Sequence, residues 1–226
     1  MKITIVNTSD IRGGASIAAF RLFKILHKKY PGSRMLVREK SGSETGVNGL
    51  NNSFAQRILI NTRFFLEHFS FIFRAASKDK WFAFSPSSFG QNIADLPEIK
   101  NADIIHLHWI NNGFLKPGDI RKLVDTGKQL VWTLHDMWAF TGGCHYPGSC
   151  TNYTQACGNC NFLKFPAEGD LSNRNHLKKL KSYADSGIIF IAVSNWMAEN
   201  ARKSSLIGNC RIEVIPNPID SSMYKP

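Results

Sequence analysis

Short, nearly continuous apolar runs alternate along the chain with longer segments in which apolar residues lie three or four positions apart. The runs are typical of strands buried on both faces of a parallel sheet, and we expect strands at residues 2–6, 34–38, 103–107, 129–134, 188–193 and 211–215. The longer segments predict helices, which we expect at residues 15–29, 53–76, 116–125, 171–184 and 195–203. This alternation predicts an α/β fold, a single Rossmann-like, doubly wound parallel sheet.

The segments between the predicted strands and helices indicate where loops lie and where the domain ends. Residues 41–52 are rich in glycine, serine and asparagine, which predicts a loop. Two prolines in the segment V-I-P-N-P-I-D at 214–220 favour an extended connector. We therefore expect one domain over residues 1–215, with a cysteine-rich loop inserted at 141–163, and the start of a linker at 216–226.

Composition narrows the class of protein. The chain has 226 residues, 43% hydrophobic and 20% charged, as in an ordinary soluble globular protein. Its net charge of +11 favours anionic partners such as nucleotide phosphates, an acidic bilayer surface or nucleic acid. The basic residues are scattered and no nucleic-acid-binding motif is visible, so a zinc-containing nucleic-acid-binding module is the weaker alternative and we expect no nucleic acid. Without a secretory signal or an apolar stretch of roughly 18 residues, we expect a cytoplasmic protein.

A polar pair, His135 and Asp136, comes directly after the predicted strand at 129–134. Open α/β sheets bind their ligands at the carboxyl ends of the strands. There an imidazole can hydrogen-bond a hydroxyl, and a carboxylate can accept a proton or orient a hydroxyl. We interpret the pair as catalytic candidates; the alternative is a histidine that caps a loop and an aspartate that starts a turn.

The predicted strand at 103–107 carries His106 and is followed by His108 and Trp109. Because Leu107 separates the two histidines, we expect their imidazoles to point to opposite faces of the sheet. His106 is then interpreted as a buried, hydrogen-bonded core residue. His108 and Trp109, at the carboxyl end of the strand, are candidates for substrate binding.

Arg12, Gly13 and Gly14 lie between the first predicted strand and the first predicted helix. Free backbone N–H groups and the helix dipole can hold an anion at such a place, and Arg12 could add a phosphate contact. The pattern is not G-x-G-x-x-G. The residues by themselves therefore favour a tight turn that requires glycine.

The inserted loop carries four cysteines in the pattern C-x5-C-x6-C-x2-C: Cys144, Cys150, Cys157 and Cys160. Only the last pair has the spacing of a zinc knuckle, although His145 could replace one ligand. In a cytoplasmic protein a structural zinc site is favoured over two disulfides, and four separate thiols are the third alternative. We expect this loop to lie beside His135.

Residues 53–84 combine many phenylalanines with basic residues. A basic helix with an aromatic face can lie in a membrane interface, so peripheral contact with the inner face of the membrane is one interpretation, and an ordinary helix packed on the sheet is the other. Lys178, Lys179 and Lys181 are expected on a solvated helix face. Cys210 is interpreted as a small buried apolar residue.

Several motifs occur in order along nearly the whole chain: N-T-S-D-I-R-G-G-A (7–15), D-I-I-H-L-H-W (103–109), W-T-L-H-D-M-W-A-F-T-G-G-C-H-Y (132–146), C-T-N-Y-T-Q-A-C-G-N-C (150–160), I-A-V-S-N-W (191–196) and V-I-P-N-P-I-D (214–220). Together they resemble the N-terminal, acceptor-side half of a retaining family-4 glycosyltransferase with the GT-B fold. The long histidine-aspartate block with its cysteine loop is the most specific part of this resemblance.

The resemblance implies transfer of a sugar from a nucleotide-sugar donor to a hydroxyl of a glycan or lipid-linked acceptor, in cell-surface polysaccharide or glycolipid synthesis. It implies that His135 is functional and that Gly13 and Gly14 lie against donor diphosphate and acceptor; Trp138, in the same block as His135, joins the candidate substrate contacts. No catalytic metal is expected. In that family the 214–220 motif leads into a second, donor-binding domain, so we expect this chain to be incomplete and inactive alone. A non-catalytic acceptor-binding or scaffold protein is the alternative.

Overall fold

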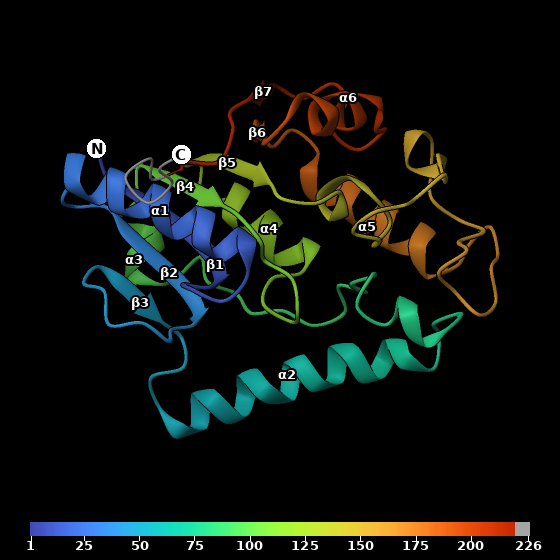
Figure 1. The fold of residues 1–226 in the computed structure, drawn as a ribbon, viewed down its shortest axis with the longest axis horizontal. Helices are drawn as coiled ribbons and strands as arrows, with labels where there is room; N and C mark the ends of the chain where they lie inside the picture. The colour runs from blue at the N-terminus through green and yellow to red at the C-terminus, as the bar shows by residue number, and fades with distance from the viewer. Residues whose placement is uncertain (220–226) are drawn as a thin grey trace, which may run out of the picture.

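In a computed structural model, which describes residues 1–219, the chain forms one seven-stranded sheet in the order β3-β2-β1-β4-β5-β6-β7 (Figure 1). The strands are β1 (Ile3–Ser9), β2 (Arg34–Glu39), β3 (Val47–Gly49), β4 (Ile104–Leu107), β5 (Gln129–Leu134), β6 (Ile189–Ala192) and β7 (Ile212–Val214). Every neighbouring pair is parallel. The strand order reverses between β1 and β4, which confirms the predicted doubly wound parallel fold.

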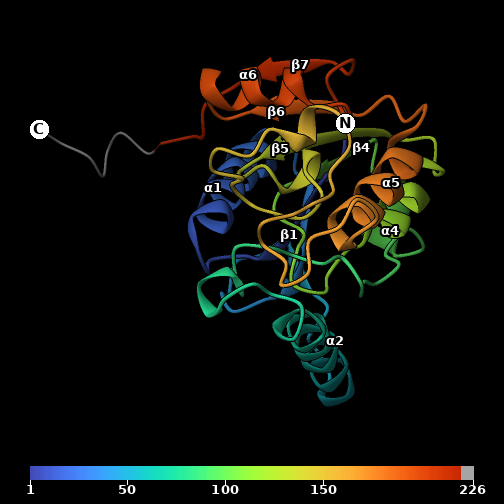
Figure 2. The same ribbon diagram turned by 90° about the vertical axis from the view of Figure 1, so that its right-hand side faces the viewer.

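Helices flank both faces of this sheet. The helices of the chain are α1 (Gly14–Lys29), α2 (Phe54–Ile72), α3 (Pro97–Lys100), α4 (Pro117–Val124), α5 (Leu171–Tyr183) and α6 (Asn195–Lys203). Short 3-10 turns occur at Lys78–Lys80, Trp138–Phe140 and Asn152–Thr154. Figure 2 shows α1 on one side of the sheet and α4 and α5 on the other. The helix α2 instead runs along one side of the molecule, apart from the strands.

The central strand β1 is buried along its whole length, and its successive side chains point to opposite faces of the sheet. Ile5 packs with Phe23 of α1 on one face. Val6 belongs to the larger cluster on the other face, which includes Ile120 of α4. Because helices cover both faces, the apolar run is continuous rather than alternating.

Side-chain caps begin the helices α2 and α5. Ser53 accepts a hydrogen bond from the backbone N–H of Gln56, whose side chain accepts one from the N–H of Ser53, and this capping box begins α2. Asp170 begins α5 by accepting from the backbone N–H groups of Ser172 and Asn173. Asp170 also accepts from the N–H of Cys160, so the cap of α5 holds the end of the cysteine loop.

Some sequence-based predictions are wrong in detail. The predicted loop at 41–52 contains β3, which pairs with β2 through Met35 and Val47; a strand this short has too few side chains to show a pattern. The α2 helix ends at Ile72 rather than at 76. Lys179 is fully buried rather than solvated. Cys210 is only half-buried.

Residues 216–219 of the predicted linker have no regular secondary structure, and the remaining residues 220–226 lie outside the described residues. Within residues 1–219, no helix has the length and apolar character needed to cross a membrane.

Candidate active site at the carboxyl ends of β4 and β5

Two neighbouring strands bring the candidate histidines together. In the register of β4 and β5, Leu107 lies beside Trp132, so the segments that follow these strands leave the sheet at the same edge. The Nδ1 of His108 and the Nε2 of His135 are 2.9 Å apart and hydrogen-bonded. The two ring centroids lie 5.2 Å apart in a stacked arrangement.

The prediction that His106 and His108 point to opposite faces is wrong. Side chains two positions apart on a strand share a face, and the two ring centroids lie 4.5 Å apart. His106 is buried, and its Nε2 is 2.8 Å from the Oγ1 of Thr133, which confirms its interpretation as a hydrogen-bonded core residue. His108 is also buried, whereas His135 is half-buried.

All three imidazoles are neutral at physiological pH. Burial lowers the pKa of His135 to about 4, and the adjacent Asp136 carboxylate opposes this only in part. Burial and the nearby His135 lower the pKa of His106 to about 4. Burial also holds the pKa of His108 well below its ordinary value, and the two neighbouring imidazoles add to this effect. Each ring therefore offers one N–H donor and one lone pair rather than a positive charge.

The carboxylate of Asp136 holds the surrounding loops in place. Its Oδ2 accepts from the Nδ1 of His145 at 2.7 Å and from the Nε1 of Trp109 at 2.8 Å. Its Oδ1 accepts from the backbone N–H of Trp138 at 2.8 Å. Burial acts to raise the pKa of Asp136, but the charge and hydrogen bond of His145 and the other donors bring it below its ordinary value. Asp136 is thus an ionised anchor for three segments.

The glycine turn lies across the same edge of the sheet, at the start of α1. Gly13 is the N-cap of α1 with φ of 90°, a conformation that favours glycine. Gly14 needs no such conformation, and a Cβ added there would meet no atom within 4 Å. Open space therefore lies above the first turn of α1.

Sequence reasoning missed Asn7, which links this turn to the histidines. Its Oδ1 accepts from the backbone N–H of Trp109 at 2.8 Å, and its Nδ2 donates to the Oγ of Ser16 in α1 at 2.9 Å. The signal available in the sequence was an asparagine directly after the first apolar run, and the structure shows that its amide is fully buried. Arg12 is exposed beside the turn, with its Nη1 3.8 Å from a carboxylate oxygen of Glu39.

Trp109 and Trp138, both candidate substrate contacts, occupy different environments. Trp109 is half-buried. Trp138 is only 2% exposed, and its Nε1 donates to the backbone oxygen of Ser85. The Nζ of Lys179 lies 3.7 Å from the centre of its ring. The expectation for Trp138 is therefore corrected: a tryptophan enclosed by core and lysine has no free surface for a substrate.

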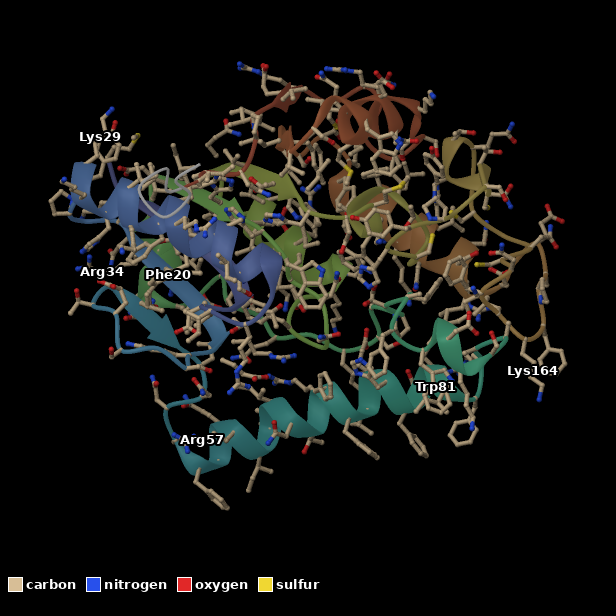
Figure 3. All side chains as sticks on the ribbon, in the orientation of Figure 1. Phe20, Lys29, Arg34, Arg57, Trp81 and Lys164 are labelled. Carbon is tan, nitrogen blue, oxygen red and sulfur yellow. The ribbon has the colours of Figure 1, made fainter. Side chains whose placement is uncertain are left out.

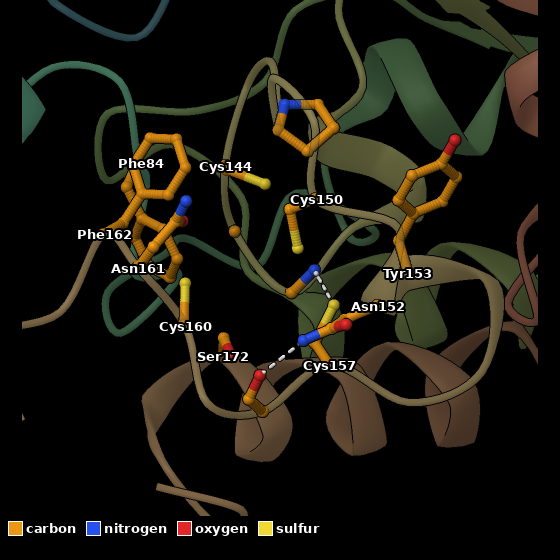
Figure 4. Close-up of a pocket in the computed structure, with 14 residues that line it drawn as sticks. Phe84, Cys144, Cys150, Asn152, Tyr153, Cys157, Cys160, Asn161, Phe162 and Ser172 are labelled. Carbon is orange, nitrogen blue, oxygen red and sulfur yellow. Dashed lines mark hydrogen bonds between the residues drawn. The ribbon is translucent and has the colours of Figure 1, made fainter. Parts of the chain in front are cut away.

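The four clustered cysteines line one cavity of about 20 Å³ (Figure 4). All are free thiols, so the disulfide alternative is not found. The N–H of Gly142 donates to the Sγ of Cys157 at 3.1 Å. Burial raises the pKa of Cys144 to about 12 and that of Cys157 to about 11. Within residues 1–219, no three histidine, cysteine or carboxylate side chains stand in an arrangement that could hold a metal ion.

The loop lies beside His135, as predicted, since Tyr146 donates through its hydroxyl to the backbone oxygen of His135 at 3.3 Å. His145 is not a substitute for a cysteine ligand. Its Nδ1 is bonded to Asp136 and its Nε2 lies 2.9 Å from the Oγ of Ser85, so both ring nitrogens are engaged.

Comparison with known proteins relates the chain to a family of glycosyltransferases. The sequence pattern of Glycosyltransferase Family 4 matches residues 61–222. WcaC of Escherichia coli (strain K12), provisionally assigned as a colanic acid biosynthesis glycosyl transferase, is 28% identical over 130 residues, which are 55% of this chain and 32% of that protein. Crystal structures of Anabaena HepE in complex with UDP-glucose and with UDP and glucose match at 13% identity with TM-scores of 0.49 and 0.47. These matches cover 100% of this chain and 46% and 47% of the HepE chains, so the chain spans less than half the length of these relatives.

Proposed function

Because the chain belongs to Glycosyltransferase Family 4, we propose that it provides the acceptor-side part of an active site that transfers a sugar, with retention, from a nucleotide-sugar to a hydroxyl. The acceptor is a glycan or a lipid-linked glycan in cell-surface polysaccharide or glycolipid synthesis. The observation that carries this proposal is the joint placement of His135 and the glycine turn at the carboxyl edge of a doubly wound sheet, where such folds bind ligands.

Each part of the site has a role in this proposal. The open N-terminus of α1 at Gly14 receives the donor diphosphate, because backbone N–H groups and the helix dipole favour an anion there. His135, with its solvent-facing edge, contacts the transferring sugar or the acceptor hydroxyl. Asp136 positions Trp109 and the loop after β5 rather than exchanging protons, since its carboxylate already accepts three hydrogen bonds.

The test is a transfer assay with a panel of radiolabelled nucleotide-sugars and membrane-extracted acceptors. Residues 1–226 are assayed alone and joined to a donor-binding domain of the same family. We expect transfer with retained anomeric configuration from the joined protein and none from residues 1–226. Turnover by residues 1–226 alone would contradict the need for a second domain, and an inverted product would contradict the retaining mechanism.

For the membrane partner, we propose that α2 lies in the interface of an anionic bilayer, which brings the site to a lipid-linked acceptor. The outward face of α2 together with its C-cap residue, here called the α2 ridge, presents apolar side chains that are between 47% and 79% exposed: Phe54, Ile58, Phe65, Phe69 and, at the C-cap, Phe73. Figure 3 shows the α2 side chains projecting away from the body of the protein, with Arg57 near the start of the helix and Trp81 and Lys164 near its other end.

Charge supports an anionic surface as the occupant of the α2 ridge. The only acidic residue of α2, Glu67, is buried and accepts hydrogen bonds from the N–H groups of the 87–89 segment. Ser88 of that segment also lines an open groove of about 730 Å³ between α4 and α5. The charged residues that line this groove are all basic: Lys116, Arg121, Lys122, Lys178 and Lys181. The α2 ridge can insert into the interface of a bilayer, and the basic groove can attract its anionic headgroups.

For the cysteine loop, we propose a structural Zn²⁺ held by Cys144, Cys150, Cys157 and Cys160 after rotation of their side chains toward the shared cavity. The cavity has room for one small ion. The side-chain nitrogen of Lys179 lies close by, bonded to the backbone oxygens of Trp138 and Thr141, and forms no ion pair within residues 1–219. Burial lowers the pKa of Lys179 to about 7, so an anionic cluster beside it would favour its charged form. Four thiolates around Zn²⁺ carry a net negative charge that offsets the cost of burying this cation.

A further inference from the structure

The hydrogen bond between His108 and His135 admits two arrangements of protons. Both rings are neutral, so one nitrogen of the pair donates and the other accepts. If His108 donates from Nδ1, the hydrogen of His135 sits on its Nδ1. If His135 donates from Nε2, its Nδ1 carries only a lone pair. The two arrangements give His135 opposite chemistry, because Nδ1 is then either a hydrogen-bond donor or a proton acceptor.

The Nδ1 of His135 is the atom that can reach a ligand. It makes no hydrogen bond within residues 1–219, yet it is not among the enclosed polar atoms that lack a partner. It is therefore open to solvent at the carboxyl edge of the sheet. What this nitrogen offers to a substrate depends on the proton arrangement at His108.

The surroundings of His108 distinguish the two arrangements. Its Nε2 is enclosed and has no hydrogen-bond partner within residues 1–219, and the same holds for the Oδ1 of Asn111. Both residues line one cavity of about 10 Å³. If the Nε2 of His108 carried a hydrogen, a buried N–H would remain unmet although an unmet carbonyl oxygen lines the same cavity, and orphaned buried N–H groups are rarer than orphaned acceptors. If it carries a lone pair, both unpaired atoms are acceptors, the less costly kind of buried group to leave without a partner.

We therefore propose that His108 is a positioning residue that donates from Nδ1 to His135 and fixes His135 as the tautomer with its hydrogen on Nδ1. His135 then presents a neutral N–H to the substrates, which can hydrogen-bond a sugar hydroxyl or a phosphate oxygen but cannot take a proton at that nitrogen. The meaning of this donor for catalysis rests on the proposed transferase function. In that reaction the base for the acceptor hydroxyl is then an oxygen of the leaving phosphate.

The tautomer can be measured in residues 1–226 without any substrate, by two-bond ¹H–¹⁵N correlation of the imidazole rings in uniformly ¹⁵N-labelled protein at neutral pH. We expect a protonated Nδ1 and an unprotonated Nε2 for both His108 and His135. A protonated Nε2 on His135 would overturn the proposal. This outcome is separate from the transfer assay, because the tautomer can be as proposed in a protein that fails to transfer sugar.

Two substitutions of His108 test whether its hydrogen-bond donor sets the tautomer of His135. His108→Asn places an amide N–H near the position of Nδ1 and should leave His135 with its hydrogen on Nδ1. His108→Asp has nearly the same shape as His108→Asn but places a carboxylate, which accepts rather than donates, near the position of Nδ1, and should draw the hydrogen of His135 to Nε2. His106→Gln, at an equally buried position on the same face, is the matched control and should leave His135 unchanged. An unchanged His135 tautomer in His108→Asp would also overturn the proposal.

Discussion

Asp136 joins three segments of the site that are far apart in sequence. Through Trp109 it holds the end of β4, through the N–H of Trp138 the turn after β5, and through His145 the returning cysteine loop. An ionised carboxylate is suited to this, because hydrogen bonds to a charged acceptor are stronger than those between neutral groups. His135, by contrast, has one ring nitrogen bonded to His108 and the other open to solvent. Asp136 therefore holds the segments of the site together, and His135 is the residue with a ring nitrogen available to a substrate.

This division predicts different effects for the two residues in the joined enzyme. His135→Ala should lower kcat by at least about tenfold, the low end for a positioned group in the site, with little change in the urea midpoint of unfolding. Asp136→Asn should lower both kcat and the unfolding midpoint, because an amide NH₂ cannot accept from His145 or Trp109. Kinetics and urea denaturation of the same preparations measure both quantities. Full turnover in His135→Ala would show that the assignment of His135 to the active site is wrong.

Two connecting elements contact the residues that follow β4 and β5: the glycine turn before α1, through Asn7, and the cysteine loop after β5, through Tyr146. The turn is held to β4 through Asn7, which bonds both Trp109 and Ser16. The cysteine loop is held to α5 through Asp170 and through Asn173, whose Nδ2 donates to the backbone oxygen of Cys157. In both elements the backbone is fixed by buried or half-buried polar side chains rather than by regular hydrogen bonding.

The two glycines of the turn should respond differently to alanine. Gly13→Ala is strained by the φ of 90° and should destabilise the fold. Gly14→Ala meets no atom within 4 Å and removes a glycine from α1, so stability should be unchanged or slightly higher. If the donor diphosphate binds there, the added methyl should still raise the KM for the nucleotide-sugar several-fold. An unchanged KM in Gly14→Ala would place the donor elsewhere.

The cysteine loop yields a prediction about metal content. Protein purified under reducing conditions should contain about one equivalent of zinc, and chelation should lower its melting temperature. Cys157→Ser should lose the metal, because it removes a ligand that also accepts from the N–H of Gly142. Cys210→Ser, outside the cluster, is the matched control and should keep it. Metal-free protein in which all the cysteines react as free thiols would end the zinc proposal.

At the scale of the whole molecule, the sheet and α2 face different partners. The carboxyl edge of the sheet presents the histidines and the glycine turn, whereas α2 extends along one side of the molecule (Figures 1 and 2). The apolar side chains of the α2 ridge are exposed. Only Ile60, Glu67 and Phe71 of α2 are buried. The alternative of an ordinary helix packed on the sheet is therefore not what the fold contains. A helix with so many exposed apolar side chains marks a surface that binds another protein or a membrane.

The α2 ridge predicts lipid binding that depends on aromatic side chains and on lipid charge. Residues 1–226 should co-sediment with vesicles containing phosphatidylglycerol and much less with neutral vesicles, and binding should weaken with salt. Phe65→Ser with Phe69→Ser should weaken binding by roughly tenfold or more, since each phenylalanine that is buried contributes more than about 1.4 kcal/mol. Ile25→Ser, an equally exposed apolar site on α1, should have no effect. Equal binding of all variants, or binding to neutral vesicles alone, would contradict the proposal.

The sequence alone determined the features that depend on neighbouring residues. The apolar runs specify the strands because a parallel strand covered on both faces needs apolar side chains in succession, as Ile5 and Val6 show. The position of His135 also follows from local order, because any residue directly after β5 lies at the carboxyl edge of the sheet. The capping residues Ser53 and Asp170 likewise act on the turn that follows them.

Only the tertiary structure decided which distant residues meet. The pairing of His108 with His135 depends on β4 lying next to β5 in a particular register, and the burial of Lys179 depends on where α5 packs against Trp138. The short strand β3 exists through its pairing with β2 rather than through its own composition. Such contacts join residues far apart along the chain, and their energies depend on burial and geometry that no local pattern encodes. For this reason the sequence located the candidate site, and the fold assigned the individual roles within it.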